Sequence, residues 1–221
     1  MGVIVVGVLR RRLQHVDVQA NPKAALRSRY RQVRQQQPGG AALVEALVGA
    51  LTQELAPLRR AGAIGLYWPL SGEPDLRPLT EQVALQSCTW ALPAVLAPAA
   101  TAAAPANQAQ LHYLPWQPGE RLQPDACGIP APACATGTHR SPLDPEQLAL
   151  LLVPALAVDR DGIRLGYGGG WYDRLRAQPA WRRCLSLVVL PAACVCRSSL
   201  PRDPWDVPFD GWIDEHGLHR C

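Results

Sequence analysis

Short runs of apolar residues along the chain alternate with longer stretches of mixed apolar and polar positions. The apolar runs predict buried strands at 63–68, 88–95, 111–114, 149–153 and 185–190, with a final short strand near Trp212. The mixed stretches predict helices over 23–36, 41–60 and 74–86, and another from Trp171 onward. Strands separated by helices favour a parallel arrangement. We therefore expect a single-domain α/β fold, a mostly parallel sheet with helices on both faces.

The first predicted helix carries two different stripes. It begins at Asn21-Pro22, a capping residue followed by a proline suited to the first helical position. Positions four and three residues apart form an apolar stripe of Leu26, Tyr30 and Val33 and a basic stripe of Lys23, Arg27, Arg31 and Arg34. The basic stripe has no acidic neighbours in sequence, and a run of charges like this one is usually a solvated face. Lys23 is the only lysine in the chain, however, and this favours a specific role for it.

A glycine-dense turn, residues 166–170, lies between a predicted strand and the helix from Trp171. Four of its five residues are glycines, which allow positive φ angles and leave the backbone N–H groups open to an anion. The turn matches neither the P-loop pattern nor the dinucleotide fingerprint, so a phosphate cradle and a plain strand-to-helix connection both stay open. Asp173 in the first helical turn could stabilise the helix dipole or hold Mg²⁺. In parallel sheets such a turn lies at the ligand-binding carboxyl edge.

Composition limits the functional classes. With 221 residues and 48% hydrophobic content, the chain can bury one sizeable core. The 22 basic and 18 acidic residues give a net charge of +4, too small to indicate nucleic-acid binding and compatible with an anionic small molecule. The Ala/Pro-rich segment 97–108 is predicted to be a surface loop without chemistry.

The cysteines and the start of the chain favour a cytoplasmic protein. Seven cysteines without a C-x-x-C pair predict reduced, mostly buried thiols and no zinc site. The apolar run 1–8 precedes Arg10, Arg11 and Arg12, the wrong order for a secretory signal, and it is too short to cross a bilayer. We therefore expect neither a membrane nor a nucleic acid as a partner.

Five motifs in order along the chain carry a family resemblance. They are Lys23-x-x-Leu26-Arg27, Tyr67-Trp68-Pro69 with Glu73, Leu111-x₄-Trp116-x₂-Gly119, Gly128-Ile129-x-x-Pro132, and the segment from Arg164 to Arg174. This set resembles the 5-formyltetrahydrofolate cyclo-ligase family from about residue 21 to 217. The resemblance implies a cyclo-ligase domain over 21–221. Residues 1–20 have no counterpart and would be either a disordered arm or a misassigned start.

The resemblance implies a reaction that uses ATP and Mg²⁺. 5-Formyltetrahydrofolate would become 5,10-methenyltetrahydrofolate, with release of ADP and phosphate, after the formyl oxygen attacks the γ-phosphate and the second folate nitrogen closes the ring. Such chemistry needs aligned substrates and neutralised phosphate charge, with no side-chain nucleophile. The sequence agrees, because it contains no G-x-S-x-G motif.

The resemblance also implies site residues. ATP would contact Lys23, Arg27, Arg164, Leu165, Gly166, Tyr167, Gly168, Gly169, Gly170, Trp171 and Tyr172. The folate would contact Trp68, Glu73, Tyr167 and Trp171. Asp173 and Asp206 would hold Mg²⁺, with Asp210 as a weaker stand-in for Asp206. From the residues alone, Trp68 fits ordinary strand packing and Glu73 fits a helix-start acid.

Two positions depart from the family pattern, and they motivate an alternative. Gly169 stands where many members have lysine, and Ala131 stands where glutamate is usual. A non-catalytic folate or nucleotide binder could tolerate both changes, although the retained Asp173 and Asp206 favour the enzyme. A sugar-phosphate isomerase or transferase on a similar sheet is a third reading. An assay for methenyltetrahydrofolate with and without MgATP separates the three.

Overall fold

The computed structural model describes residues 22–37, 40–97, 109–133 and 140–221. Its centre is a seven-stranded sheet in the order β12-β11-β9-β6-β1-β2-β3. The strands are β1 (Ala63–Gly65), β2 (Trp90–Leu96), β3 (Gln110–Trp116), β6 (Leu148–Pro154), β9 (Ser186–Val189), β11 (Gly211–Asp214) and β12 (Gly217–Arg220). Neighbouring strands run parallel from β11 to β2, and the two edge strands β12 and β3 are antiparallel. The expected mostly parallel sheet is confirmed.

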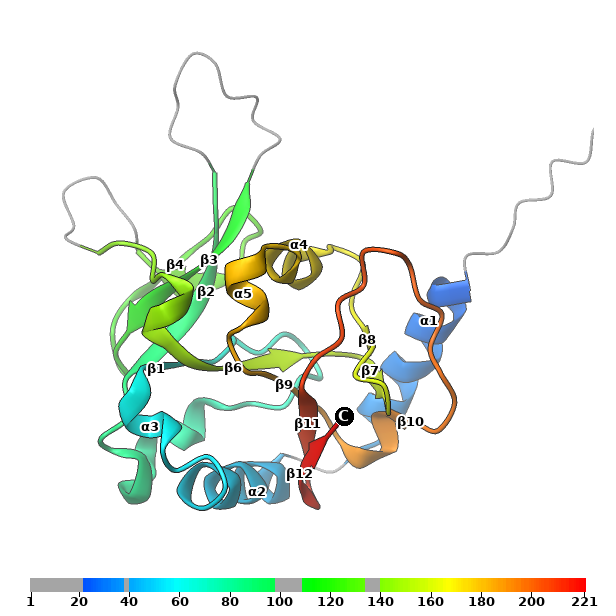
Figure 1. The fold of residues 1–221 in the computed structure, drawn as a ribbon, viewed down its shortest axis with the longest axis horizontal. Coiled ribbons are helices and arrows are strands. Elements are labelled where there is room, and N and C mark those ends of the chain that lie inside the picture. Colours follow the sequence, from blue (N-terminus) through cyan, green and yellow to red (C-terminus); the bar gives the residue numbers. More distant parts are fainter. Residues whose placement is uncertain (1–21, 38–39, 98–108, 134–139) are drawn as a thin grey trace, which may run out of the picture.

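Helices cover both faces of this sheet (Figure 1). One face carries α2 (Ala41–Thr52) and α3 (Leu58–Ala61), and the other carries α4 (Trp171–Ala177) and α5 (Pro179–Arg182). The helix α1 (Pro22–Gln35) lies beside a small sheet of β10 (Val195–Cys196), β7 (Ala157–Asp159) and β8 (Arg164–Leu165). A two-stranded ribbon, β4 (Leu122–Pro124) with β5 (Pro130–Pro132), completes the strands.

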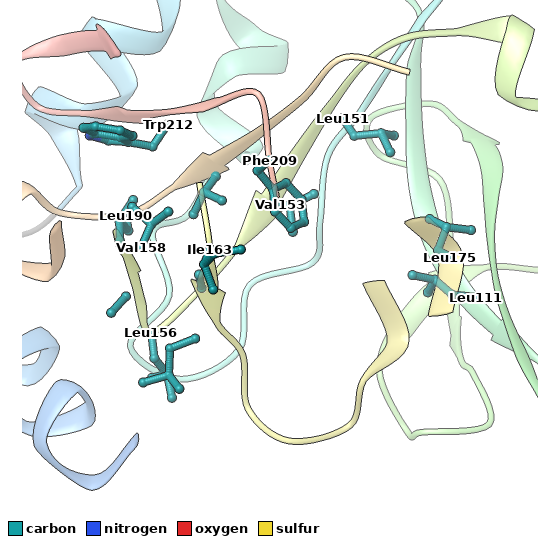
Figure 2. Packing of buried hydrophobic residues seen from close by; sticks show 14 of the residues in the cluster. Leu111, Leu151, Val153, Leu156, Val158, Ile163, Leu175, Leu190, Phe209 and Trp212 are labelled. Carbon is teal, nitrogen blue, oxygen red and sulfur yellow. The ribbon is translucent and has the colours of Figure 1, made fainter. Parts of the chain in front are cut away.

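The central strand β6 shows how the sequence builds two cores. Side chains alternate between the faces of a strand, so an unbroken apolar run is expected when both faces are covered. Leu150 and Leu152 belong to the cluster under α2, whereas Leu151 and Val153 belong to the cluster that includes Leu175 of α4. Figure 2 shows the second cluster. All four of these β6 side chains are fully buried.

Prolines explain two wrong predictions. The helix predicted over 41–60 is broken, since α2 ends at Thr52 and α3 begins only after Pro57. The helix predicted over 74–86 is absent. Two 3₁₀ turns replace it, η1 (Arg77–Glu81) and η2 (Val83–Leu85). Pro78 has no N–H to donate, and its ring clashes with the preceding helical turn, which disfavours a continuous α-helix through this stretch.

Other expectations changed in detail. The strand predicted at 63–68 ends at Gly65, and the glycine segment follows β8 of the small sheet instead of following the buried strand β6 directly. The hairpin strand β12 has no counterpart in the prediction.

The described cysteines are free, but only Cys88, Cys184 and Cys194 are buried, so the prediction of mostly buried thiols is wrong for this part of the chain. The predicted extension 1–20 and nearly all of the predicted loop 97–108 lie outside the described residues. Within the described ranges, no helix is both long and apolar enough to cross a membrane.

Candidate functional site

A pocket of about 320 Å³ opens at the carboxyl edge of the central sheet, where α/β proteins bind ligands. Pro154 at the end of β6 and the residues that follow β1, Tyr67 and Trp68, line it. Apart from the stand-in Asp210, every site residue predicted from sequence also lines it: Lys23, Arg27, Trp68, Glu73, Arg164, Leu165, Gly166, Tyr167, Gly168, Gly169, Gly170, Trp171, Tyr172, Asp173 and Asp206. Segments far apart in the chain therefore share one hollow, although the role of each residue stays a prediction.

The glycine segment needs its glycines for two different reasons. Gly168 and Gly170 adopt φ angles of 108° and 65°, which residues with a Cβ rarely take. At Gly166 the need is space, because a Cβ would lie 2.5 Å from Nη1 of Arg164. The segment is also tied to α1, since Nε of Arg27 donates to the carbonyl oxygen of Gly166 at 2.9 Å. The turn thus allows the close backbone approach that a phosphate ligand requires.

Arg164 and Asp173 form a pair at the end of this segment. Nη2 of Arg164 lies 3.0 Å from both carboxylate oxygens of Asp173. Only 6% of the Arg164 side chain is exposed, and its guanidinium packs 5.3 Å from the ring centre of Tyr172 and 5.5 Å from that of Phe209. Its Nε has no hydrogen-bond partner among the described residues. Asp173, predicted as a helix-start acid or a metal ligand, here neutralises a nearly buried cation.

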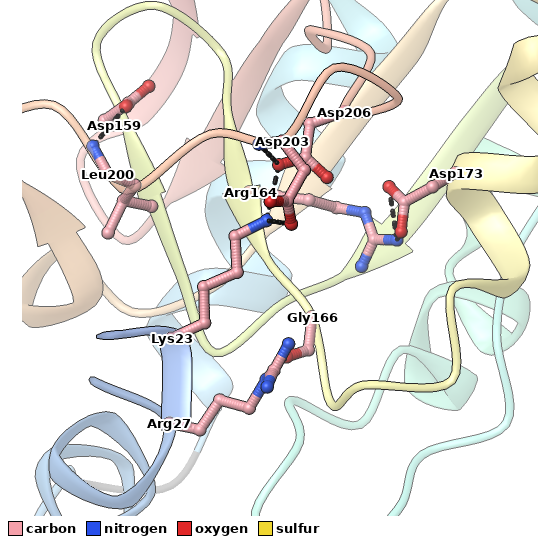
Figure 3. A network of polar contacts seen from close by, with 9 residues as sticks. All are labelled: Lys23, Arg27, Asp159, Arg164, Gly166, Asp173, Leu200, Asp203 and Asp206. Atoms are coloured by element: carbon pink, nitrogen blue, oxygen red, sulfur yellow. Dashed lines mark hydrogen bonds and ion pairs between the residues drawn. The ribbon is translucent and has the colours of Figure 1, made fainter. Parts of the chain in front are cut away.

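Lys23 forms a second charge cluster with residues from the other end of the chain (Figure 3). Its Nζ lies 2.6 Å from Oδ2 of Asp203 and 2.5 Å from Oδ2 of Asp206. Burial lowers the pKa of Lys23, but the hydrogen bonds and charges of the two aspartates outweigh burial and raise it overall. The ammonium therefore stays charged, and Lys23 finds through tertiary structure the acidic partners that it lacks in sequence.

The loop that carries Asp203 and Asp206 is anchored on both sides. Before it, the backbone N–H of Leu200 donates to Oδ2 of the buried Asp159 at 2.8 Å (Figure 3). After it, Nη2 of the buried Arg176 donates to the carbonyl oxygen of Pro208 at 2.8 Å. Both anchors belong to elements that pack in the core. They hold the loop against the pocket.

The opposite side of the pocket carries Trp68 and Glu73. Trp68 lies after the end of β1, partly buried against the core cluster under α2, and the guanidinium of Arg77 lies 4.7 Å from its ring centre. Oε2 of Glu73 accepts a hydrogen bond from the backbone N–H of Leu70 at 2.8 Å. Its Oε1 is buried and has no partner among the described residues. A buried carboxylate oxygen with an open lone pair is suited to accept a hydrogen bond from a ligand.

Sequence reasoning missed several lining residues. Asp203 and Trp205 lie within the same short run as Asp206, Arg202-Asp203-Pro204-Trp205-Asp206, and this proximity was the available signal. Trp205 is 65% exposed, which is unusual for a large aromatic side chain. No sequence pattern pointed to Asp125, because only the fold brings it to the pocket.

Of the remaining positions named from sequence, Asp210, Ala131 and Gly169, one lines the pocket and two do not. Asp210 does not line the pocket, and its carboxylate accepts a hydrogen bond from the backbone N–H of Ser186 at 2.8 Å. Ala131 is buried in β5, packed with Ala94 and Leu114 and away from the pocket lining. Of the two departures from the family pattern, only Gly169 therefore lies at the site.

The charges lining the pocket suggest what it can bind. The described lining contains three cationic side chains and five carboxylates. A polyphosphate would meet net repulsion there unless a divalent cation came with it. The described residues contain no group of three or more His, Cys, Asp or Glu side chains placed to hold a metal. Mg²⁺ is commonly held by one or two carboxylates together with substrate phosphates and water, so Asp173 and Asp206 stay candidates without a larger cluster.

Comparisons with known proteins agree with this architecture. The profile of the 5-formyltetrahydrofolate cyclo-ligase family matches residues 19–214. The chain is 29% identical over 151 residues to a 5-formyltetrahydrofolate cyclo-ligase of Haemophilus influenzae, covering 68% of this chain and 74% of the relative. It is 29% identical over 154 residues to the Escherichia coli K12 protein of the same name, covering 69% and 78%.

Solved structures show the same fold. The 5,10-methenyltetrahydrofolate synthetase of Aquifex aeolicus superposes with a TM-score of 0.64 at 27% identity, over 90% of this chain and 92% of that one. The synthetase of Mycoplasma pneumoniae superposes with a TM-score of 0.60 at 20% identity, over 87% and 98%.

Proposed function

The chain belongs to the 5-formyltetrahydrofolate cyclo-ligase family, and we propose that it closes the folate ring with ATP as co-substrate and Mg²⁺ as metal. It is a 5-formyltetrahydrofolate cyclo-ligase, the activity also named 5,10-methenyltetrahydrofolate synthetase. The observation that carries the ATP and Mg²⁺ assignment is the convergence of cations, carboxylates and the glycine segment on one pocket.

The proposed chemistry has two steps. The formyl oxygen attacks the γ-phosphorus of ATP, and ADP leaves. The second folate nitrogen then attacks the former formyl carbon and loses its proton, and phosphate leaves as the ring closes. Phosphoryl transfer of this kind depends mainly on positioning and charge stabilisation, so the enzyme needs no nucleophilic side chain.

We assign the nucleotide to the side of the pocket formed by α1 and the glycine segment. Lys23 and Arg27 extend toward it from α1, and Arg164 approaches from β8 (Figure 3). The open backbone of Gly166 to Gly170 would admit the phosphates. Two of the three cations are already paired with aspartates. Phosphate would therefore share these cations with carboxylates, which favours nucleotide bound together with a divalent metal.

We assign the pterin to the side formed by Trp68 and Glu73, with Tyr167 and Trp171 between the two substrates. The ring of Trp68 offers an aromatic face, and the open Oε1 of Glu73 can accept a hydrogen bond from a pterin N–H. Burial, and next the charge of Glu73, raise the pKa of Tyr167, so its hydroxyl stays protonated. Tyr167 can therefore donate a hydrogen bond near neutral pH.

Asp173 and Asp206 are the proposed metal carboxylates. Bound Mg²⁺ would neutralise charge on the transferring phosphoryl group. In the structure Asp173 is paired with Arg164 and Asp206 with Lys23. Each cation would turn toward phosphate when metal and nucleotide bind. The free thiols of the described cysteines suit a reducing compartment, and we propose the cytoplasm.

The alternative of a non-catalytic binder loses part of its support. Ala131 lies away from the pocket, so only Gly169 remains as a departure at the site. At Gly169 a Cβ would lie 2.9 Å from Cδ1 of the Trp171 ring, so a lysine there would require that ring to move. In this chain, Arg27 and Arg164 provide cations at the segment instead.

The deciding experiment follows methenyltetrahydrofolate by its absorbance. Purified protein is mixed with 5-formyltetrahydrofolate alone, with ATP and a chelator, and with ATP plus Mg²⁺. Product is expected only in the last mixture. Folded protein that binds both ligands but forms no product would support the binder, and product without ATP would refute the proposed co-substrate.

A further inference from the structure

We propose that Arg34 is a positioning residue that holds the folate-facing loop 70–73 and Tyr167, the residue assigned between the two substrates, in one arrangement. The names of the two sides rest on the proposed function. Arg34 lies in the last turn of α1 and is only 6% exposed. A charged side chain is rarely buried unless its polar groups have partners. Its partners are therefore the informative feature.

One part of the guanidinium holds the loop that carries Glu73. Nε donates to the carbonyl oxygen of Gly72 at 2.8 Å, and Nη2 donates to that of Ser71 at 3.4 Å. Gly72 has a φ of 79°, so the loop turns there in a conformation that favours glycine. These contacts fix the backbone directly before Glu73.

The remaining nitrogen holds the glycine segment. Nη1 donates to the hydroxyl oxygen of Tyr167, and the guanidinium lies 5.5 Å from the centre of the Tyr167 ring. Tyr167 and Glu73 both line the pocket, whereas Arg34 does not. Arg34 lines a separate hollow of about 310 Å³ together with Gly72 and Glu73. Arg34 therefore contacts both the loop before Glu73 and Tyr167 without lining the pocket itself.

This geometry demands a guanidinium. A planar fork can reach two backbone carbonyls and a hydroxyl at once, whereas a lysine ammonium is a single point of charge with three rotatable donors. The reaction needs the formyl oxygen in line with the γ-phosphate, and a small misplacement of either substrate lowers the rate strongly. One residue that fixes both loops would keep the two substrates aligned.

The test compares Arg34→Met and Arg34→Lys with Arg31→Met, an exposed position on the same helix. Calorimetry gives the Kd of 5-formyltetrahydrofolate and of MgATP separately, and initial rates give kcat. For Arg34→Met we expect both Kd values to rise and kcat to fall by about tenfold or more. Arg34→Lys should recover little, and Arg31→Met should match the wild type.

Two further measurements make the proposal refutable. Guanidinium ion at non-denaturing concentration should restore part of the Arg34→Met rate by entering the hollow, and it should have no such effect on Arg31→Met. If Arg34→Met does not fold, Arg34→Lys serves as the test variant, because it keeps the charge but loses the planar fork, and both of its Kd values should still rise. Wild-type values in folded Arg34→Met, or a change confined to one ligand, would overturn the proposal. A wild-type protein that binds both ligands without turnover would refute the proposed function while leaving the two Kd comparisons decisive for Arg34.

Discussion

The two charge clusters that line the pocket are built in opposite ways. Arg164 and Asp173 are nine residues apart in sequence, on either side of the glycine segment. Lys23 meets Asp203 and Asp206 across separations of 180 and 183 residues. Among the described residues, the local pair has one cation and one carboxylate, whereas the distant cluster has one cation and two carboxylates.

This difference predicts different consequences when a carboxylate is lost. In the local pair the cation is nearly buried, so removal of Asp173 would leave the guanidinium charge unpaired. In the distant cluster Asp203 would still neutralise Lys23 after Asp206 is removed. Loss of Asp173 should therefore lower both stability and activity, whereas loss of Asp206 should lower activity with little loss of stability.

The largest effect is expected from the two proposed metal carboxylates. Asp206→Asn and Asp173→Asn should each lower kcat by about 10²-fold or more, since both weaken charge stabilisation of the phosphoryl group. Asp206→Asn should cost less, about 1 kcal/mol of stability, because Asp203 still pairs with Lys23 and an amide oxygen can still accept the backbone N–H of Asp203. Asp173→Asn should cost about 1–3 kcal/mol, because Arg164 loses its charge partner. Initial rates over a Mg²⁺ titration and chemical denaturation measure the two quantities.

Several outcomes would contradict this contrast. Equal stability losses for the two variants would show that the distant cluster is no more redundant than the local pair. An unchanged Mg²⁺ dependence in either variant would remove that carboxylate from the proposed metal site. Asp210→Asn is the matched control, since Asp210 does not line the pocket and its loss should leave the Mg²⁺ dependence unchanged.

A smaller effect is expected when the cation of the distant cluster changes shape. Lys23→Arg keeps the charge, but the longer planar guanidinium cannot take the place of a compact ammonium between two carboxylates and phosphate. We expect the KM for ATP to rise by about tenfold, equivalent to about 1.4 kcal/mol. Steady-state rates at varied MgATP concentration check this value.

Arg31→Lys is the control for the lone lysine. Arg31 is exposed on α1, and its replacement should leave ATP dependence and thermal unfolding unchanged. If Lys23→Arg also behaved like the wild type, the single lysine would be an accident of composition.

The smallest effect concerns the glycine segment itself. Gly166→Ala places a Cβ 2.5 Å from Nη1 of Arg164, at the far end of a flexible side chain that can move aside. Arg164 should then shift away from Asp173, and we expect the KM for ATP to rise a few-fold without loss of folding. Steady-state kinetics and a thermal melt measure the result.

A glycine elsewhere provides the comparison. Gly49 lies inside α2, and a Cβ there would meet no described atom within 4 Å. Gly49→Ala should therefore stabilise the protein by about 0.5–1 kcal/mol, because alanine is the better helix former. Its kinetics should not change. Identical behaviour of the two alanine variants would mean that the space at Gly166 is not needed for ATP binding.

The sequence by itself determined the layers of the fold and the glycine segment. The apolar runs that became β2, β6 and β9 were recognisable because burial on both faces requires them, and Pro22 marked the start of α1. The glycine segment was also readable, since its constraints of φ and close approach act between neighbours in the chain. The helix predicted over 74–86 failed because apolar spacing outweighed the prolines in the prediction.

Only the tertiary structure decided which charges meet. Nothing local to Lys23 indicates Asp203, and nothing local to Arg34 indicates Gly72 or Tyr167. These partners come from segments whose approach depends on how helices pack over the sheet, a property of the whole core. The physical reason is range: backbone conformation is set by neighbouring residues, whereas ion pairs and side-chain hydrogen bonds form wherever packing brings two groups within a few ångströms.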